Sequence, residues 1–322
     1  MSNANQDEAK KGRPSSRRVP PAGAPADNDG AQGRSDERPF IVGIGASAGG
    51  LEALSLLLPG LPKNLGLTYV VVQHLSPTYR SMMSQLLGRE TTMPVKDIED
   101  GTSPEANTVY ITPPNRNLTL LAGCFRLVEP ARESMPKPSV NRFFASLAEE
   151  IGESTIGIIL SGTGSDGAAG IHAIKAAGGF TFAQDPDTAK YNGMPQSAID
   201  TGSVDWILPP ESMGAEISLI VLNRGLIPVA TQAASAPATL KTLLGKVRAR
   251  TQVDFSQYKE PTLWRRIERR MAANHVSTLQ DYLQVVDQTP LELEKLCKDI
   301  LISVTAFFRD SDAFARLDKV IG

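Results

Sequence analysis

Gly43-Ile44-Gly45-Ala46-Ser47-Ala48-Gly49-Gly50 lies between a short apolar run and a helical pattern. Residues 40–44 show no polar alternation, which is typical of a strand covered on both faces of a sheet. Residues 51–58 have the apolar spacing of a helix, which ends near Pro59-Gly60. The octet therefore predicts a strand–turn–helix unit. As Gly-x-Gly-x-x-Ala its turn is a dinucleotide-binding loop, and as Gly-x-Ser-x-Gly it presents a nucleophilic serine.

The same alternation continues along the chain and predicts an α/β domain. Further apolar runs that are typical of buried strands lie at residues 67–72, 108–111, 155–160, 180–183 and 204–208. Helical patterns lie at residues 78–87, 140–151, 168–177 and 197–201. Residues 118–121 and 125–128 flank Ala122-Gly123-Cys124 and predict a hairpin. Strands that alternate with helices indicate a doubly wound, mainly parallel sheet.

Composition divides the chain into four parts. Residues 1–38 are rich in Pro, Gly and charged side chains, so we expect a disordered tail. Residues 39–225 form the α/β domain, and residues 226–241 are a linker of small side chains. Residues 242–322 form a small all-α domain, with helices expected at residues 262–274, 278–288 and 291–304.

The bulk properties exclude several classes of protein. The chain has 322 residues and a formal net charge of −2, which gives no general case for nucleic-acid binding. No stretch approaches the roughly 20 apolar residues of a membrane span, and the N-terminus lacks the apolar core of a signal peptide. Cys124 and Cys297 are the only cysteines and fit neither a disulfide framework nor a zinc motif. We therefore expect a cytoplasmic protein without membrane insertion and without a metal site.

The second apolar run distinguishes the two interpretations of the octet. A dinucleotide-binding loop would be followed, about 20 residues on, by an acidic residue that binds the ribose. The run at residues 67–72 instead ends in Gln73-His74. Because the carboxyl ends of parallel strands meet at one edge of a sheet, we expect His74 to lie beside Ser47. A hydrogen-bonded structural histidine is the alternative.

A second glycine-rich turn supplies a carboxylate at the same edge. The run at residues 155–160 leads into Ser161-Gly162-Thr163-Gly164-Ser165-Asp166-Gly167. Asp166 is an N-cap of the following helix, a role worth about 1 kcal/mol, or the carboxylate that orients His74, and the two roles are compatible. Ser47 as nucleophile, His74 as general base and Asp166 form a candidate triad. Its chain order differs from the Ser–Asp–His order of α/β-hydrolases.

Four motifs in order resemble the catalytic domain of the CheB-type chemotaxis protein-glutamate methylesterases. They are residues 45–50, Gln73-His74, residues 162–168 and Gly193-Met194-Pro195, within about residues 38–220. The resemblance implies a serine hydrolase that removes methyl groups from glutamate side chains of chemoreceptors and releases methanol. Some members also deamidate glutamine. No cofactor is implied for the esterase, and the implied partners are methyl-accepting chemoreceptor helices and other chemosensory signalling proteins.

The resemblance also implies roles around Ser47. The turn and oxyanion positions are Gly45, Ala48, Gly49 and Thr163, and the substrate-side positions are Met194 and Pro195. Many members have Met where this chain has Thr163. The phospho-accepting receiver domain of the family has no counterpart here, so control by phosphorylation in cis is not expected.

Residues 264–271 form a basic helical pattern that contains Arg265, Arg266, Arg269 and Arg270. They make either a solvated face or a dock for an acidic partner helix. With residues 305–310, this segment resembles the N-terminal helical domain of CheR-type chemoreceptor methyltransferases, over about residues 240–322. The resemblance implies receptor docking by these arginines and S-adenosylmethionine contacts by Thr305 and Arg309. No methyltransferase domain follows, so we expect a truncated hybrid that does not bind this cofactor well alone.

Two other functions stay open from the residues alone. A nucleotide-binding oxidoreductase would hold its cofactor at the octet, but the acidic residue after the second strand is missing. A non-catalytic signalling scaffold would keep the triad as a relic and use the basic helix to bind a partner. Only the hydrolase predicts that a serine-reactive phosphonate modifies Ser47.

Overall fold

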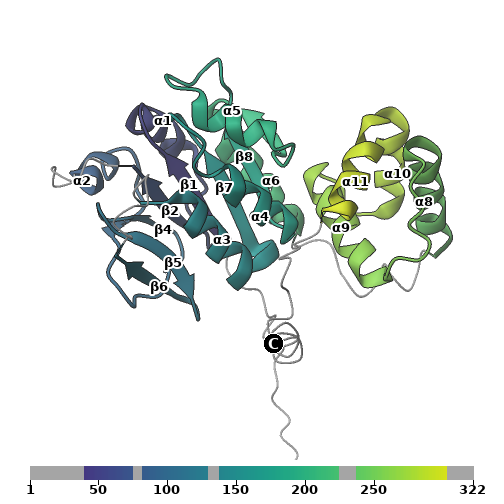
Figure 1. Ribbon diagram of the computed structural model, residues 1–322, viewed down its shortest axis with the longest axis horizontal. Coiled ribbons are helices and arrows are strands. Elements are labelled where there is room, and N and C mark those ends of the chain that lie inside the picture. The colour runs from purple at the N-terminus through teal and green to yellow at the C-terminus, as the bar shows by residue number, and fades with distance from the viewer. Residues whose placement is uncertain (1–39, 75–81, 130–137, 225–236, 303–322) are drawn as a thin grey trace, which may run out of the picture. The chain divides into compact units, whose positions relative to one another are not determined.

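The computed structural model describes residues 40–74, 82–129, 138–224 and 237–302, which all belong to one compact unit (Figure 1). A seven-stranded parallel sheet has the order β3-β4-β2-β1-β7-β8-β9. Its strands are β1 (Ile41–Ala46), β2 (Thr68–Gln73), β3 (Val95–Asp97), β4 (Thr108–Ile111), β7 (Thr155–Ile159), β8 (Phe180–Gln184) and β9 (Trp206–Leu208). An antiparallel hairpin pairs β5 (Asn117–Leu121) with β6 (Cys124–Val128).

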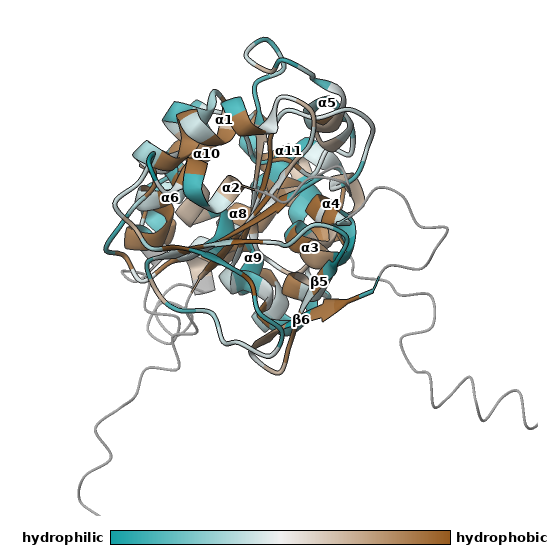
Figure 2. Ribbon diagram, turned by 90° about the vertical axis from the view of Figure 1, so that its left-hand side faces the viewer, coloured by the Kyte–Doolittle hydropathy of each residue, from teal (hydrophilic) through white to brown (hydrophobic). Residues whose placement is uncertain are grey.

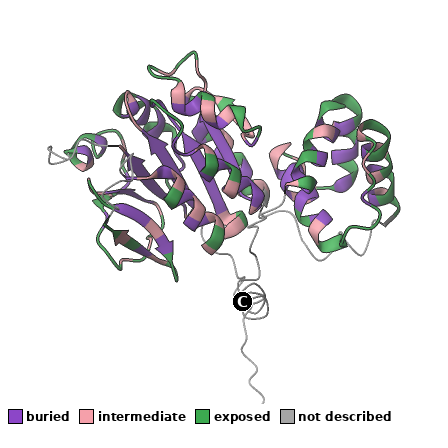
Figure 3. Ribbon diagram, in the orientation of Figure 1, coloured by how far each residue is buried: buried purple, intermediate pink, exposed green. Residues whose placement is uncertain are grey.

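Helices cover both faces of the sheet. They are α1 (Gly50–Leu57), α2 (Met83–Leu87), α3 (Val140–Glu150), α4 (Ala168–Ala176), α5 (Gly193–Asp200) and α6 (Pro210–Arg224), with 3-10 turns η1 (Leu58–Gly60) and η2 (Gly152–Ser154). Alternate residues of β1 enter different core clusters: Val42 and Ile44 pack with α1 and α6, and Ile41 packs with α3 and α4. Every residue of β1 and β2 is therefore buried, which explains their continuous apolar runs (Figures 2 and 3).

The strand order places the switch point of the sheet at β1. The chain runs from β1 to β2 on one side, and β7, β8 and β9 follow on the other side. The register pairs Ala46 with Gln73 and Gly45 with Ile159. The residues that follow these three strands therefore meet at the carboxyl edge, where α/β folds bind their ligands.

The last described segment is all-α. It contains α8 (Pro237–Thr251), α9 (Glu260–Ala273), α10 (Leu279–Gln288) and α11 (Leu291–Leu301). Its buried apolar side chains include Val247, Ile267, Met271, Tyr282 and Leu296, and they belong to the same core cluster as α1 and α6. None of the helices in the described ranges is both long and apolar enough to cross a membrane.

The predicted fold class, an α/β parallel sheet with a hairpin and a following helical region, is confirmed. The elements β3, α6 and α8 were not predicted. The expected linker at residues 226–241 is wrong for residues 237–241, which begin α8, because proline fits the first turn of a helix. The expected tail, residues 226–236 of the linker and the region after residue 302 lie outside the described residues.

Candidate active site

Ser47 lies directly after β1, in the turn that leads into α1. Its backbone N–H donates to the carbonyl of Ser161, which follows β7 (2.9 Å). The N–H of Gly50 donates back to the Ser47 carbonyl (2.9 Å) and closes the turn. Gly49 caps α1 with a φ of 74°, a left-handed conformation that favours glycine. The turn thus presents a half-buried serine at the N-terminus of a helix.

Two polar side chains from the neighbouring strands hold this turn. Gln73 Nε2 donates to the carbonyls of Ser47 (2.6 Å) and His74 (3.2 Å). Ser161 Oγ donates to the Ala48 carbonyl (2.8 Å) and accepts from the Tyr191 N–H (3.0 Å). Sequence reasoning missed both positioning roles. The only signal was that each residue ends or follows an apolar run at the active edge.

The structure brings His74 and Asp166 together. His74 Nε2 lies 2.9 Å from Asp166 Oδ2, and the two side chains are 11% and 5% exposed. Asp166 also accepts hydrogen bonds from the N–H groups of Val140 (2.7 Å) and Asn141 (3.0 Å). Burial alone raises the pKa of Asp166, but the hydrogen bonds from His74, Asn141 and Val140 outweigh it and hold this pKa below its usual range. Asp166 is therefore an ionised acceptor at neutral pH.

The orientation of the imidazole assigns its two nitrogens. Because Nε2 of His74 donates to the ionised Asp166, Nδ1 is the ring nitrogen that this contact does not engage. Ser47 and His74 follow paired residues of adjacent strands, and the His74 N–H donates to the Ala46 carbonyl (3.0 Å). Among the described residues no hydrogen bond joins Ser47 Oγ to the imidazole. Such contacts often form only when substrate is bound.

The predicted oxyanion residues fall into two groups. The backbone N–H groups of Ala48 and Gly49, at the start of α1, have no hydrogen-bond partner within the described ranges, and Thr163 is exposed on the facing turn. Gly45 instead lies inside β1, where a Cβ would come within 2.5 Å of a methyl group of Val140. Its role is close packing of α3 against the sheet. Ala48, Gly49 and Thr163 remain candidates for the oxyanion site.

The predicted substrate-side residues support the site from within. Met194 is fully buried, and Pro195 is buried beside it. A Cβ on Gly162 would meet Met194 Sδ at 2.2 Å and Ser47 Cβ at 2.8 Å. Only a glycine therefore fits at position 162, between Met194 and Ser47. The expectation that Met194 and Pro195 face the substrate needs correction, since neither side chain is exposed.

The basic helix is largely buried, whereas a solvated face or a docking surface was expected. Arg266, Arg269 and Arg270 of α9 are only 4%, 4% and 5% exposed, whereas Arg265 is exposed. Arg266 donates to the carbonyls of Lys175 (3.2 Å) and Ala176 (2.6 Å), at the C-terminal end of α4. Burial, followed by the charges of Arg265 and Arg269, lowers the pKa of Arg266 to about 10.

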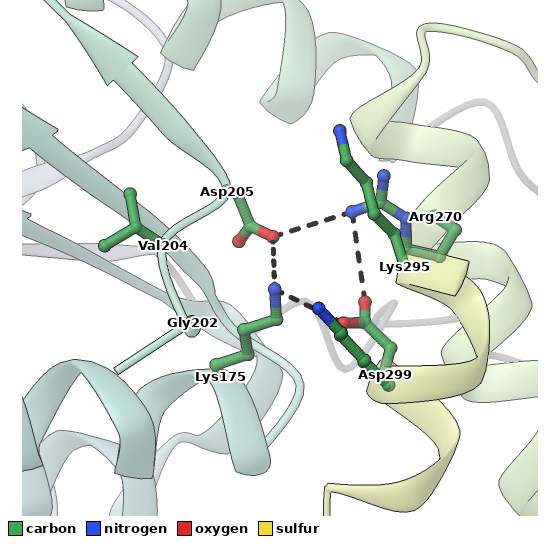
Figure 4. A pocket seen from close by; sticks show the side chains of 8 residues that line it. Lys175, Gly202, Val204, Asp205, Arg270, Lys295 and Asp299 are labelled. Atoms are coloured by element: carbon green, nitrogen blue, oxygen red, sulfur yellow. Dashed lines mark hydrogen bonds and ion pairs between the residues drawn. The ribbon is translucent and has the colours of Figure 1, made fainter. Parts of the chain in front are cut away.

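Buried carboxylates neutralise the other two arginines. Arg269 pairs with Asp205 and, at 2.5 Å, with Asp299, and Arg270 makes a bidentate pair with Glu292 (2.7 and 2.6 Å). Lys175 joins the cluster at 2.9 Å from Asp205 and 3.3 Å from Asp299 (Figure 4). These contacts connect α9 and α11 to α4 and β9. The prediction that Arg266, Arg269 and Arg270 dock a receptor is therefore wrong for this structure, because these side chains are buried and their guanidinium groups are bonded to carboxylates or carbonyls inside the protein.

Thr305 and Arg309 lie outside the described residues. Within the described ranges no group of three or more His, Cys, Asp or Glu side chains is arranged to hold a metal ion.

Comparison with known proteins matches two parts of the chain to different family models. The family model "CheB methylesterase" matches residues 42–217, and the model "CheR methyltransferase, all-alpha domain" matches residues 238–301. The crystal structure of the Thermotoga maritima CheB methylesterase catalytic domain is similar at 34% identity with a TM-score of 0.53, covering 56% of this chain and 97% of that one.

Two longer relatives extend the comparison. The chain is 36% identical over 263 residues to an uncharacterized 104.1 kDa protein in the hypE 3'region of Rhodobacter capsulatus, covering 74% of this chain and 28% of that protein. It is 37% identical over 185 residues to protein-glutamate methylesterase/protein-glutamine glutaminase 1 of Carboxydothermus hydrogenoformans, covering 55% of this chain and 54% of that protein. The chain thus spans about half or less of these relatives. Since more than half of it matches the family model, the chain belongs to the CheB methylesterase family and carries a CheR-type all-α domain in the same polypeptide.

Proposed function

We propose that this chain is a protein-glutamate methylesterase that hydrolyses glutamate γ-methyl esters on chemoreceptors in chemotaxis-type signalling. The observation that carries the proposal is the 2.9 Å contact between His74 and an ionised Asp166, at the strand ends that also present Ser47. The relative from Carboxydothermus hydrogenoformans carries both the methylesterase and the glutaminase name. The same site would deamidate glutamine, because both reactions transfer a γ-acyl group to water.

The reaction follows from the residues in place. Ser47 Oγ attacks the γ-carbonyl carbon while His74 Nδ1 takes its proton, and Asp166 stabilises the imidazolium through Nε2. The N–H groups of Ala48 and Gly49, with the Thr163 turn opposite, stabilise the oxyanion. His74 then protonates the departing methoxide, which leaves as methanol. A water molecule, deprotonated by His74, releases the glutamate and frees Ser47. These steps use side chains, backbone N–H groups and water.

We further infer the setting of this activity. Cys124 and Cys297 are both free thiols, which suits the reducing cytoplasm. Methyl-accepting chemoreceptor helices are the proposed substrates, and other chemosensory signalling proteins are the proposed partners. Of the four arginines proposed to dock the receptor, only Arg265 is exposed to do so.

The test is methanol release from receptor membranes carrying radiolabelled methyl groups. The wild-type chain should release labelled methanol, and Ser47→Ala should reduce the rate at least about 10³-fold while its circular dichroism stays unchanged. A Ser47→Ala variant with wild-type activity would refute the proposal. A wild-type chain that folds, binds receptor membranes and releases no methanol would instead support the scaffold alternative.

A further inference from the structure

Helices α3 and α4 exchange caps at the active site. Asp166, just before α4, accepts hydrogen bonds from the N–H groups of Val140 and Asn141, the first two residues of α3 (2.7 and 3.0 Å). In return, Asn141 Oδ1 accepts from the N–H groups of Gly167 (3.0 Å) and Gly170 (2.8 Å) at the start of α4. Each helix thus satisfies amide groups that the other helix leaves unpaired.

We propose that Asn141 is a positioning residue for the catalytic carboxylate of Asp166. This inference rests on the proposed esterase function. Asn141 is bound to Asp166 through its backbone and to the residue after Asp166 through its side chain. These two bonds hold the Asp166-Gly167 segment against the start of α3. They fix the direction in which the carboxylate points, and hence its 2.9 Å contact with His74.

The chemistry of the side chain explains why an asparagine is suitable here. Two N–H donors converge on Oδ1, so the atom must be an acceptor, and an amide oxygen accepts both without adding charge. A carboxylate at this position would also accept both bonds. It would, however, place a second negative charge close to Asp166 and favour the protonated form of His74. An alanine would remove the acceptor of the Gly170 amide and leave the Gly167 amide with Asp166 Oδ1 (3.1 Å) as its remaining acceptor.

The position of Asn141 predicts an effect on the chemical step of the reaction and none on substrate binding. Asn141 supports Asp166 from the side of α3, whereas the candidate oxyanion groups lie on the Ser47 and Thr163 turns. Loss of its side chain should misdirect the imidazole and lower kcat, while substrate affinity stays unchanged. Misplacement of a catalytic group by about 1 Å costs on the order of 100-fold in rate.

The test compares full-chain variants in the methanol-release assay. Asn141→Ala should lower kcat about 10- to 100-fold with KM within about twofold of wild type. Ser146→Ala is the matched control, because Ser146 lies in the same helix and also loses two buried hydrogen bonds, to Leu120 N–H and the Phe143 carbonyl (2.9 and 2.7 Å). It should be destabilised yet keep kcat within about twofold.

Asn141→Asp supplies a second measurement, the pH profile of kcat/KM, which would not change if the role of Asn141 were only structural. It keeps the acceptor and adds a charge, so the acidic limb of the kcat/KM profile should shift to higher pH. The proposal is overturned if Asn141→Ala loses no more kcat than Ser146→Ala, or if the acidic limb of Asn141→Asp stays in place. Ser47→Ala is measured alongside. If it is inactive, such a result refutes only the positioning role; if it is active, the proposed function fails as well.

Discussion

Replacing Asp205 by asparagine should destabilise the whole described fold, because this carboxylate neutralises cations from several elements. Its side chain is 1% exposed and accepts hydrogen bonds from Lys175 Nζ (2.9 Å) and Thr181 Oγ1 (2.8 Å). It also pairs with Arg269, and Arg270 lies at 3.6 Å. Burial alone raises the pKa of Asp205, but Arg269, Lys175 and Arg270 hold it well below its usual range. Asp205 is therefore charged throughout the neutral pH range.

The expected magnitude follows from what remains after Asp205→Asn. Removing one partner of a buried ion pair costs about 3–5 kcal/mol, because the opposite charge is left uncompensated. Asp299 remains beside Lys175 and Arg269, so we expect the lower end, about 3 kcal/mol. Since Asp205 stays ionised from pH 5 to pH 8, this loss should be constant over that range.

The assay is urea denaturation of the full chain, followed by circular dichroism. Asp287→Asn is the matched control, because Asp287 pairs with Lys246 at 2.5 Å but the two side chains are 57% and 36% exposed. Exposed pairs contribute at most about 1 kcal/mol. If Asp205→Asn and Asp287→Asn lower the free energy of unfolding equally, the buried charge cluster does not stabilise the contact between α9 and the sheet domain.

Asp166→Asn gives the remaining predictions. It should lower kcat about 10³- to 10⁴-fold with little change in KM, because an amide cannot stabilise the imidazolium of His74. The methanol-release assay measures this loss. A loss of kcat below about tenfold would contradict the role of Asp166. The folded pKa of Asp166 is depressed, so its stabilisation is fully present above the unfolded pKa of about 3.9 and is lost as the pH falls through the folded value. The stability difference between wild type and Asp166→Asn should therefore shrink as the pH falls below about 4, as denaturation at a series of acidic pH values will show.

Sequence reasoning reached the candidate triad residues because strand ends follow from periodicity. Buried parallel strands are continuous apolar runs, and the residue after each run lies at the carboxyl edge. Ser47, His74 and Asp166 were found in this way, and the structure joins His74 to Asp166. Their supports were not found. Gln73 and Asn141 act on backbone groups 26 to 29 residues away, and no local pattern encodes such pairings.

The basic helix shows where charge patterns mislead. A run of arginines looks like a solvated face, because most charge runs are exposed. Arg266, Arg269 and Arg270 nevertheless recur at the three- and four-residue spacing of one helix face, the spacing that marks a buried side. Their burial depends on Asp205, Glu292 and Asp299, which lie elsewhere in the sequence. Only the tertiary fold brings these counter-charges together. The start of helix α8 was missed because the small side chains of residues 237–239 suggested a linker.

The central claim is that Ser47 is a nucleophile activated by His74 and Asp166. Its most direct test is peptide mapping by mass spectrometry after reaction of the folded chain with a serine-reactive fluorophosphonate. The account predicts one phosphonate adduct, on Ser47, formed at a rate that falls at least about 100-fold in Asp166→Asn. An adduct on another serine, with Ser47 unmodified and methanol release abolished, would contradict it.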